Sequence, residues 1–262
     1  MFFSFCEFNT LEKFTFVGLD NYERVLFSGQ YNFWQSLGFT TVFAVLTVTV
    51  INVAAFFLAY ALTRRIPGRT LYRTVFFMPN LIGGIVLGYV WKMVINYGVL
   101  LPLFGKDLSY SSTYGFWGLV AVLCWQQIGY MMIIYIAGLQ AVPDSIVEAA
   151  KIDGATGAQT LRRVIIPMMM PSVTICLFLS ITNSFKLYDQ NLSLTGGLPA
   201  VTDSTGITHK MTQMLALCIS DTYGNSAKAH GTAQAMAVVF FVIVAAISLI
   251  QLGITHRKEV QQ

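Results

Sequence analysis

The sequence predicts an all-α, polytopic membrane bundle with five full spans and a truncated helix at the N-terminus. Only 11% of the 262 residues are Asp, Glu, Lys or Arg, and 55% are hydrophobic, whereas about 25% of a soluble domain is charged. The charges are also segregated, because five long stretches contain no Asp, Glu, Lys, Arg or His. These stretches are 37–62, 74–91, 115–139, 164–185 and 231–254. About 20 apolar residues in a helix cross a hydrocarbon core of roughly 30 Å, so each stretch is predicted to span a membrane. This excludes soluble enzymes, secreted disulfide scaffolds and disordered tails.

The N-terminal residues 1–36 are expected to form the stub of a first helix followed by an interfacial segment. Residues 1–8 are apolar but too short to span a bilayer,. The segment ends in Tyr31, Phe33 and Trp34, aromatic residues of the kind that gather at membrane interfaces. Residues 37–254 are predicted to form one membrane domain, and 255–262 a cytoplasmic tail.

The basic residues predict which connectors lie in the cytoplasm, where Lys and Arg are enriched. They cluster after the first span, after the third span and after the last. These residues are Arg64, Arg65, Arg69 and Arg73, then Lys151, Arg162 and Arg163, and finally Arg257 and Lys258. The connectors 96–114 and 189–230 hold few and are expected to face outward. The C-terminus is therefore predicted to be cytoplasmic.

The second predicted span has two features that affect helix geometry. Gly84 and Gly88 are four residues apart, a spacing of small residues that lets helix backbones approach closely. We favour packing within the chain over a dimer interface. Pro79 lies in the same stretch and predicts a kink.

Amides and aromatic residues in the third and fourth spans are candidates for a substrate pathway. The candidates are Trp125, Gln126, Gln127, Tyr130, Asn183 and Ser184. Polar groups inside a membrane are costly unless they find partners or water. Two interpretations remain open: hydrogen bonds between helices, or a polar lining that binds a hydroxyl-rich cargo with flat aromatic faces for a sugar ring.

The connector 143–167 is unusually structured for a link between spans. Ser145 and Glu148 have the spacing of a capping box, which predicts the start of a helix,. Gly154 is placed to end that helix in a left-handed turn, and Thr156 with Gln159 predicts a second capping box. Two short helices are marginal alone in water, so they must dock either on their own membrane domain or on a cytosolic partner.

The connector resembles the EAA signature of bacterial ABC importer permeases. The resemblance is carried by Glu148, Ala149, Ala150, Gly154 and Pro167. It extends to 16–22, 137–143 and 194–199, which are similar to the carbohydrate branch with its maltose-type and multiple-sugar permeases. The chain is thereby identified as a member of that family, with the fold of a type I importer transmembrane domain.

The resemblance implies a set of partners and roles. The permease would pair with a second permease subunit, as a heterodimer, and with two ATP-binding subunits that hold ATP and Mg. An extracytoplasmic solute-binding protein would deliver the sugar. The five signature residues would couple the permease to the ATPase, and Trp125, Gln126, Gln127, Tyr130, Asn183 and Ser184 would lie near the positions that contact sugar.

No motif in the sequence predicts catalysis or a cofactor in this chain. There is no phosphate-binding loop, no His-Glu-x-x-His or Gly-x-Ser-x-Gly motif, and no metal site, and Cys6, Cys124, Cys176 and Cys218 are scattered. The predicted function is therefore that of a non-enzymatic permease that imports a sugar or oligosaccharide through the lipid of a bacterial cytoplasmic membrane, with no nucleic-acid partner. The alternatives are a polyol or glycerophosphodiester cargo and, in other classes, an ion-coupled secondary transporter or a membrane-embedded enzyme.

Overall fold

The computed structural model describes the chain except residues 11–12, 30, 64–66, 205, 226–228 and 257–262. Four of the basic residues that predict orientation, together with most of the predicted tail 255–262, lie outside the described residues. These four are Arg64, Arg65, Arg257 and Lys258.

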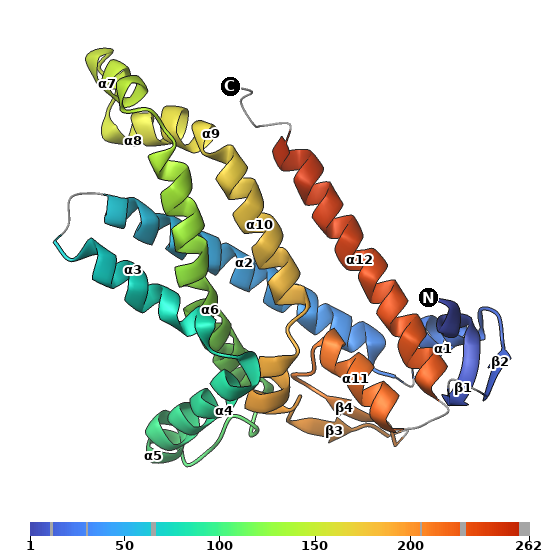
Figure 1. The fold of residues 1–262 in the computed structure, drawn as a ribbon. Coiled ribbons are helices and arrows are strands. Elements are labelled where there is room, and N and C mark those ends of the chain that lie inside the picture. The colour runs from blue at the N-terminus through green and yellow to red at the C-terminus, as the bar shows by residue number, and fades with distance from the viewer. Residues whose placement is uncertain (11–12, 30, 64–66, 205, 226–228, 257–262) are drawn as a thin grey trace. The chain divides into compact units, whose positions relative to one another are not determined.

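The chain packs as two compact units. The first unit comprises Met1–Val45, Gly83–Val122 and Asn183–Ala246, and the second comprises Leu46–Ile82, Leu123–Thr182 and Ile247–Gln262. Among the described residues, four helices contribute residues to both units: α2 (Phe33–Thr63), α6 (Ser112–Gln140), α10 (Met170–Phe185) and α12 (His230–His256) (Figure 1).

The predicted helical membrane fold is confirmed. The helices α2, α6 and α12 enclose three of the five charge-free stretches, 37–62, 115–139 and 231–254. Among the described residues, four helices are long and apolar enough to cross a membrane, and five if one bent pair counts as a single span.

The second predicted span, 74–91, is interrupted next to Pro79, where the sequence predicts a kink. Helix α3 (Arg69–Phe77) is followed by a 3-10 turn over Met78–Leu81 and by two extended residues, and α4 (Gly84–Ile95) starts afresh. Pro79 has no N–H to donate, which explains the break at the site of the predicted kink,. The candidate span here is Gly84–Phe104. It includes a π-helical turn and α5 (Leu101–Phe104), in what was predicted to be an outward connector.

The fourth predicted span is bent. Helix α8 (Gly157–Thr160), a π-helical turn and α9 (Ile166–Met168) meet α10 (Met170–Phe185) at an angle of 72°. Pro171 has no N–H for the carbonyl of Pro167, so the hydrogen bond that would cross Met169 is missing,. The chain changes direction where that bond is lost.

In the first unit, the N-terminal residues form a hairpin that packs on neighbouring helices. A 3-10 turn over Phe2–Phe5 leads into β1 (Cys6–Thr10) and β2 (Lys13–Phe16), which pair antiparallel, and then α1 (Asp20–Phe27). The amide Nδ2 of Asn21 donates to the carbonyls of Ser4 and Cys6, both at 3.0 Å. The hairpin was not expected from the sequence, and the truncated first helix stays a prediction.

The first unit also contains a second hairpin, β3 (Ala200–Thr202) with β4 (Thr208–Lys210), followed by α11 (Leu215–Asn225). An apolar core joins α1, α2, α11 and α12. Its buried members are Val25, Phe33, Leu215, Cys218, Ala235 and Met236.

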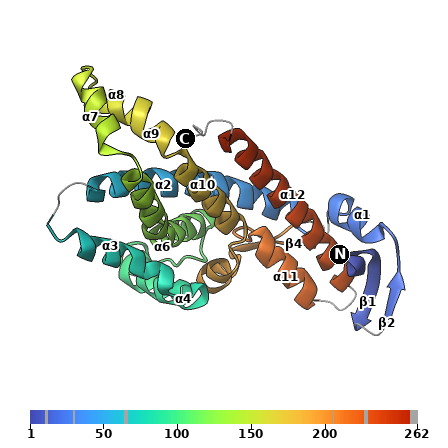
Figure 2. The ribbon, with the colours of Figure 1, turned by 45° about the horizontal axis from the view of Figure 1, so that its top comes forward.

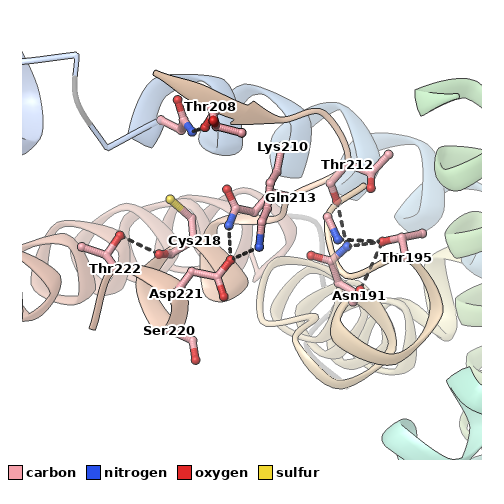
Figure 3. A network of polar contacts seen from close by, with 12 residues as sticks. Asn191, Thr195, Thr208, Lys210, Thr212, Gln213, Cys218, Ser220, Asp221 and Thr222 are labelled. Carbon is pink, nitrogen blue, oxygen red and sulfur yellow. Dashed lines mark hydrogen bonds and ion pairs between the residues drawn. The ribbon is translucent and has the colours of Figure 1, made fainter. Parts of the chain in front are cut away.

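The segment 186–214, here called the polar loop, folds around the buried amide of Asn191. Its Nδ2 donates to Thr195 Oγ1 (3.0 Å) and to the Thr212 carbonyl (2.7 Å), and its Oδ1 accepts from the N–H of Met214 (2.9 Å). Figure 3 shows the contacts of Asn191 with Thr195 and Thr212 beside a second group, in which Asp221 Oδ2 accepts from Lys210 Nζ (2.7 Å) and Gln213 Nε2 (2.6 Å). Polar side chains therefore hold the loop on itself and on α11.

The two glycines of α4 serve packing within the chain, as we favoured. A Cβ on Gly84 would lie 2.7 Å from Asp189 Cβ, and a Cβ on Gly88 would collide with the Ser193 hydroxyl. The polar loop therefore lies directly on the glycine face of α4. This contact leaves no room for larger side chains at either glycine.

Candidate functional site

The connector 143–167 begins with α7 (Asp144–Ile152), two residues earlier than the predicted capping box implies. Pro143 occupies the N-cap and no side chain caps the helix, so the predicted box of Ser145 with Glu148 is wrong. Pro143 has an extended backbone (φ −63°, ψ 131°), so Asp144 is the first helical residue. Ser145 then lies inside the first turn, and Glu148 has no capping role.

Gly154 ends α7 as predicted. Its φ is +81°, a left-handed conformation that favours glycine,. The N–H of Ala155 donates to the Ala150 carbonyl and that of Gly154 to the Lys151 carbonyl, both at 3.0 Å. This pair of bonds is a Schellman motif, which closes the helix without any side chain.

The second predicted capping box is confirmed at the start of α8. Gln159 Oε1 accepts from the N–H of Thr156 (2.8 Å), and Thr156 Oγ1 accepts from the N–H of Gln159 (3.4 Å). Local bonds therefore fix the whole helix–turn–helix shape of the connector. Figure 2 shows α7, α8 and α9 in succession, leading into α10.

The signature residues lie on the surface of this connector. Glu148, Ala149 and Gly154 are exposed, whereas Ala150 and Pro167 are half-buried. Apolar side chains are exposed beside them, because Ile152 shows 86% of its surface and Ile146 shows 40%. An exposed apolar helix face next to a carboxylate has the chemistry of a docking surface.

A cavity of about 360 Å³ adjoins the connector in the same unit. Its walls come from the ends of α2 and α6, from α7 and from the π-helical turn that follows α8. The lining residues are Tyr60, Thr63, Leu139, Gln140, Val142, Asp144, Val147 and Ile165. One side of α7 therefore borders open space rather than a packed core.

The four candidate pathway residues of α6 differ in their surroundings. Trp125 is 43% exposed, whereas Gln126 and Gln127 are 6% and 9% exposed. Gln126 Nε2 donates over 3.2 Å to the carbonyl of Ile82, which the break before α4 leaves outside the helix ladder. Tyr130 is half-buried, with its ring 6.5 Å from that of Phe77. The bond of Gln126 favours the interpretation of hydrogen bonding between helices for that residue.

Asn183 and Ser184 lie near the end of α10, Asn183 half-buried and Ser184 fully buried. They belong to the first unit, whereas Trp125, Gln126 and Tyr130 belong to the second. A joint role in cargo binding stays a prediction.

Two groups of buried polar side chains were not predicted from the sequence. One joins Asn52, Tyr135 and Ser180 inside the second unit, and the other is the polar loop. Asn52 is the one amide in the stretch 37–62, and an amide in an apolar span predicts a bonding partner. Among the described residues, no three His, Cys, Asp or Glu side chains are grouped to hold a metal ion.

The sequence of the chain matches a known protein family. The family model described as "Binding-protein-dependent transport system inner membrane component" matches residues 67–260. A probable starch degradation products transport system permease protein, AmyD of Thermoanaerobacterium thermosulfurigenes, is 41% identical over 100% of this chain and 87% of its own. The multiple sugar-binding transport system permease protein MsmF of Streptococcus mutans is 30% identical over 99% and 88%.

A solved structure has the same fold. It is a bacterial alginate ABC transporter in complex with an alginate pentasaccharide-bound periplasmic protein. The TM-score is 0.72 at 16% identity, over 92% of this chain and 83% of the other.

Proposed function

Because the chain belongs to the family of binding-protein-dependent transport system inner membrane components, we propose that it is the permease subunit of an ATP-driven importer of a sugar or oligosaccharide. The observation that carries the proposal is the connector 143–167. It has a rigid, locally capped shape, an exposed Glu148 and an 86% exposed Ile152. The names of the relatives AmyD and MsmF support a carbohydrate cargo.

The proposed assembly contains two permease subunits, two ATP-binding subunits and a solute-binding protein outside the membrane. The alginate transporter, which has this fold, is in complex with a periplasmic protein. The ATP-binding subunits hold ATP and Mg, and this chain supplies the surface on which one of them docks. The connector then lies in the cytoplasm with the C-terminus, as the distribution of Lys and Arg predicts.

Transport requires that closure of the ATPase move the spans. The Schellman motif at Gly154 and the capping box at Thr156 keep α7 and α8 in a fixed relation, so the connector moves as one piece. It continues through α9 into α10, whose far end carries Asn183 and Ser184. The differential affinity of the ATPase for the connector in its two positions supplies the free energy of the switch.

The proposed substrate pathway is lined by neutral donors, acceptors and aromatic faces. Its members are Trp125, Gln126, Gln127, Tyr130, Asn183 and Ser184. A sugar offers hydroxyl groups to the amides and its ring face to the aromatics. Because Trp125 is 43% exposed, Trp125→Ala is expected to weaken uptake more than Gln126→Ala, whose amide bonds the Ile82 carbonyl.

The coupling role is tested with Glu148→Lys in the complex purified with its ATP-binding subunits and reconstituted into proteoliposomes. We expect a loss of ATP-dependent uptake of at least tenfold with the permease still folded. Glu23→Lys is the matched control, because it makes the same charge change at an exposed position of α1 in the other unit. Wild-type uptake in the Glu148→Lys complex would contradict the assignment.

The cargo class is tested with wild-type proteoliposomes and a panel of labelled maltose, maltotriose, raffinose and sn-glycerol 3-phosphate. We expect ATP-dependent uptake of at least one sugar in the presence of its solute-binding protein. Uptake of the glycerol phosphate alone would overturn the carbohydrate assignment. Uptake that follows an ion gradient and not ATP would overturn the importer assignment itself.

A further inference from the structure

Three polar side chains from three helices meet inside the second unit. Asn52 lies on α2, Tyr135 on α6 and Ser180 on α10. Asn52 Nδ2 donates to Ser180 Oγ over 2.8 Å, and the Tyr135 hydroxyl donates to Asn52 Oδ1 over 2.7 Å. The three residues are 9%, 3% and 1% exposed. They form one chain of hydrogen bonds, here called the three-helix clamp.

The direction of every bond in the clamp is fixed by its neighbours. Asn52 Nδ2 also donates to the Val48 carbonyl (2.8 Å), and the Ser180 hydroxyl donates to the Leu177 carbonyl (3.1 Å). Carbonyl oxygens only accept, so the amide can have one orientation and both of its hydrogens have acceptors. Such a set is satisfied in one register of the three helices only, because hydrogen bonds weaken steeply with distance and angle.

The clamp lies on the part of α10 that follows the bend. Between Met169 and Ser180, the helix touches α6 at two further places. Ser172 of α10 lies against Gly138 of α6, and a Cβ added to Gly138 would collide with the Ser172 hydroxyl. The Cys176 thiol of α10 donates to the Met131 carbonyl of α6 over 3.8 Å. The first three turns of α10 are thus held against α6, and the clamp adds α2.

A bend with a missing hydrogen bond is a place where movement of the connector could be absorbed. The chain has such a bend, of 72°, between α9 and α10. If the part of α10 after the bend made no bonds to α2 and α6, a displaced connector would change only the bend angle and leave these two helices in place. If α10 is bonded to its neighbours, the same displacement moves all three helices.

We propose that the three-helix clamp is the element that passes movement of the connector 143–167 to α2 and α6, so that ATPase closure is converted into movement of the spans. Asn52, Tyr135 and Ser180 are positioning residues in this process and do not contact the cargo. The inference rests on the proposed function, because it concerns how an importer of this kind is coupled. It assigns that coupling to hydrogen bonds inside the subunit, beyond the docking surface.

The test compares transport with ATP hydrolysis in the reconstituted complex. The variants are Tyr135→Phe, Ser180→Ala and the two together, and the readout is sugar transported per ATP hydrolysed, with the panel sugar that the wild type takes up best. We expect the double variant to lower this ratio at least threefold while ATP hydrolysis stays within twofold of the wild type. Ser180→Thr keeps the hydroxyl and is expected to keep the ratio.

The control is Thr182→Ala on the same helix, because the Thr182 hydroxyl donates to the Phe178 carbonyl of α10 itself over 2.7 Å. If the sugar transported per ATP hydrolysed is unchanged in the double variant, or falls equally in the control, the proposed role of the three-helix clamp is wrong. If the double variant does not assemble, Tyr135→Phe alone decides in the same way, because it keeps the ring that packs edge-on against Phe56 at 5.8 Å. Absence of ATP-driven uptake in the wild type would instead refute the proposed function.

Discussion

The connector 143–167 and the polar loop 186–214 both join apolar helices, and they are held in opposite ways. In the connector, the hydrogen bonds of the Schellman motif and the capping box join residues at most five positions apart, as from Ala155 to Ala150. The side chain of Ile152 in the same segment is 86% exposed. In the polar loop, Asn191 is fully buried and bonds to residues 21 and 23 positions away. A segment that local bonds shape does not need to bury its side chains. Its surface remains free to meet another molecule, whereas the loop uses its polar groups on itself.

The largest effect that separates the two regions is expected from Asn191→Leu. The substitution leaves the Met214 N–H and the Thr212 carbonyl buried without their partner. An unsatisfied buried group costs about 1–3 kcal/mol, so the free energy of unfolding should fall by about 4 kcal/mol. Thermal denaturation of the purified complex measures this. Thr202→Val is the control, because that exposed hydroxyl bonds the exposed Thr208 hydroxyl across the hairpin. An equal loss in both would show that the loop is not organised around Asn191.

An intermediate effect is expected from Gly154→Ala in the connector. A left-handed conformation costs a residue with a Cβ about 1–2 kcal/mol, and Gly154 has a φ of +81°. Because Gly154 is exposed, we expect uptake to fall several-fold while the denaturation temperature of the complex changes little. Gly157→Ala is the matched control, since its φ is not positive and nothing lies within 4 Å of an added Cβ. A loss of global stability in Gly154→Ala would contradict the local character of the connector.

The smallest effect should distinguish the two capping boxes that the sequence suggests. Thr156→Ala removes an observed cap and should destabilise α8 by about 1 kcal/mol, seen as faster amide hydrogen exchange over 157–160. Ser145→Ala removes a hydroxyl that caps nothing, because Pro143 is the N-cap of α7. It should leave exchange in α7 unchanged. Faster exchange in both helices would mean that Ser145 contributes to the helix start after all.

The same contrast explains how much of the molecule could be predicted from its sequence. The left-handed turn at Gly154 and the capping box at Thr156 were predictable, since the residues that determine them are neighbours. The start of α7 was mispredicted because Pro143 competes locally with the Ser145 pattern. Both breaks in the predicted spans lie at prolines, and the kink at Pro79 was predicted whereas the bend beside Pro171 was not. An apolar stretch measures the length of a possible helix, and only the prolines within it indicate where its hydrogen bonds are interrupted.

The hydrogen-bond partners of the buried polar side chains could not be predicted from the sequence, because they are set by tertiary contacts. Asn52 meets Ser180 across 128 positions of sequence, and Asn191 reaches Thr212 through a loop whose hairpin has no strong strand pattern. Composition reveals that an amide in a membrane helix must find a partner. It does not reveal which partner. The position of the candidate coupling surface could therefore be predicted from neighbouring residues in the sequence. The side chains that connect this surface to the rest of the subunit could not be predicted in this way.

The contact between α4 and the polar loop limits which side-chain sizes can occur together at positions 88 and 193 in this permease and its relatives. Gly88 has no room for a side chain because the Ser193 hydroxyl occupies that place. Growth at one of the two positions must be matched by shrinkage at the other, so the exchange Gly88→Ser with Ser193→Gly should be accepted where Gly88→Ser alone is not. Variation at these two sites is thus expected to be paired among homologues, although more than a hundred residues separate them in the chain.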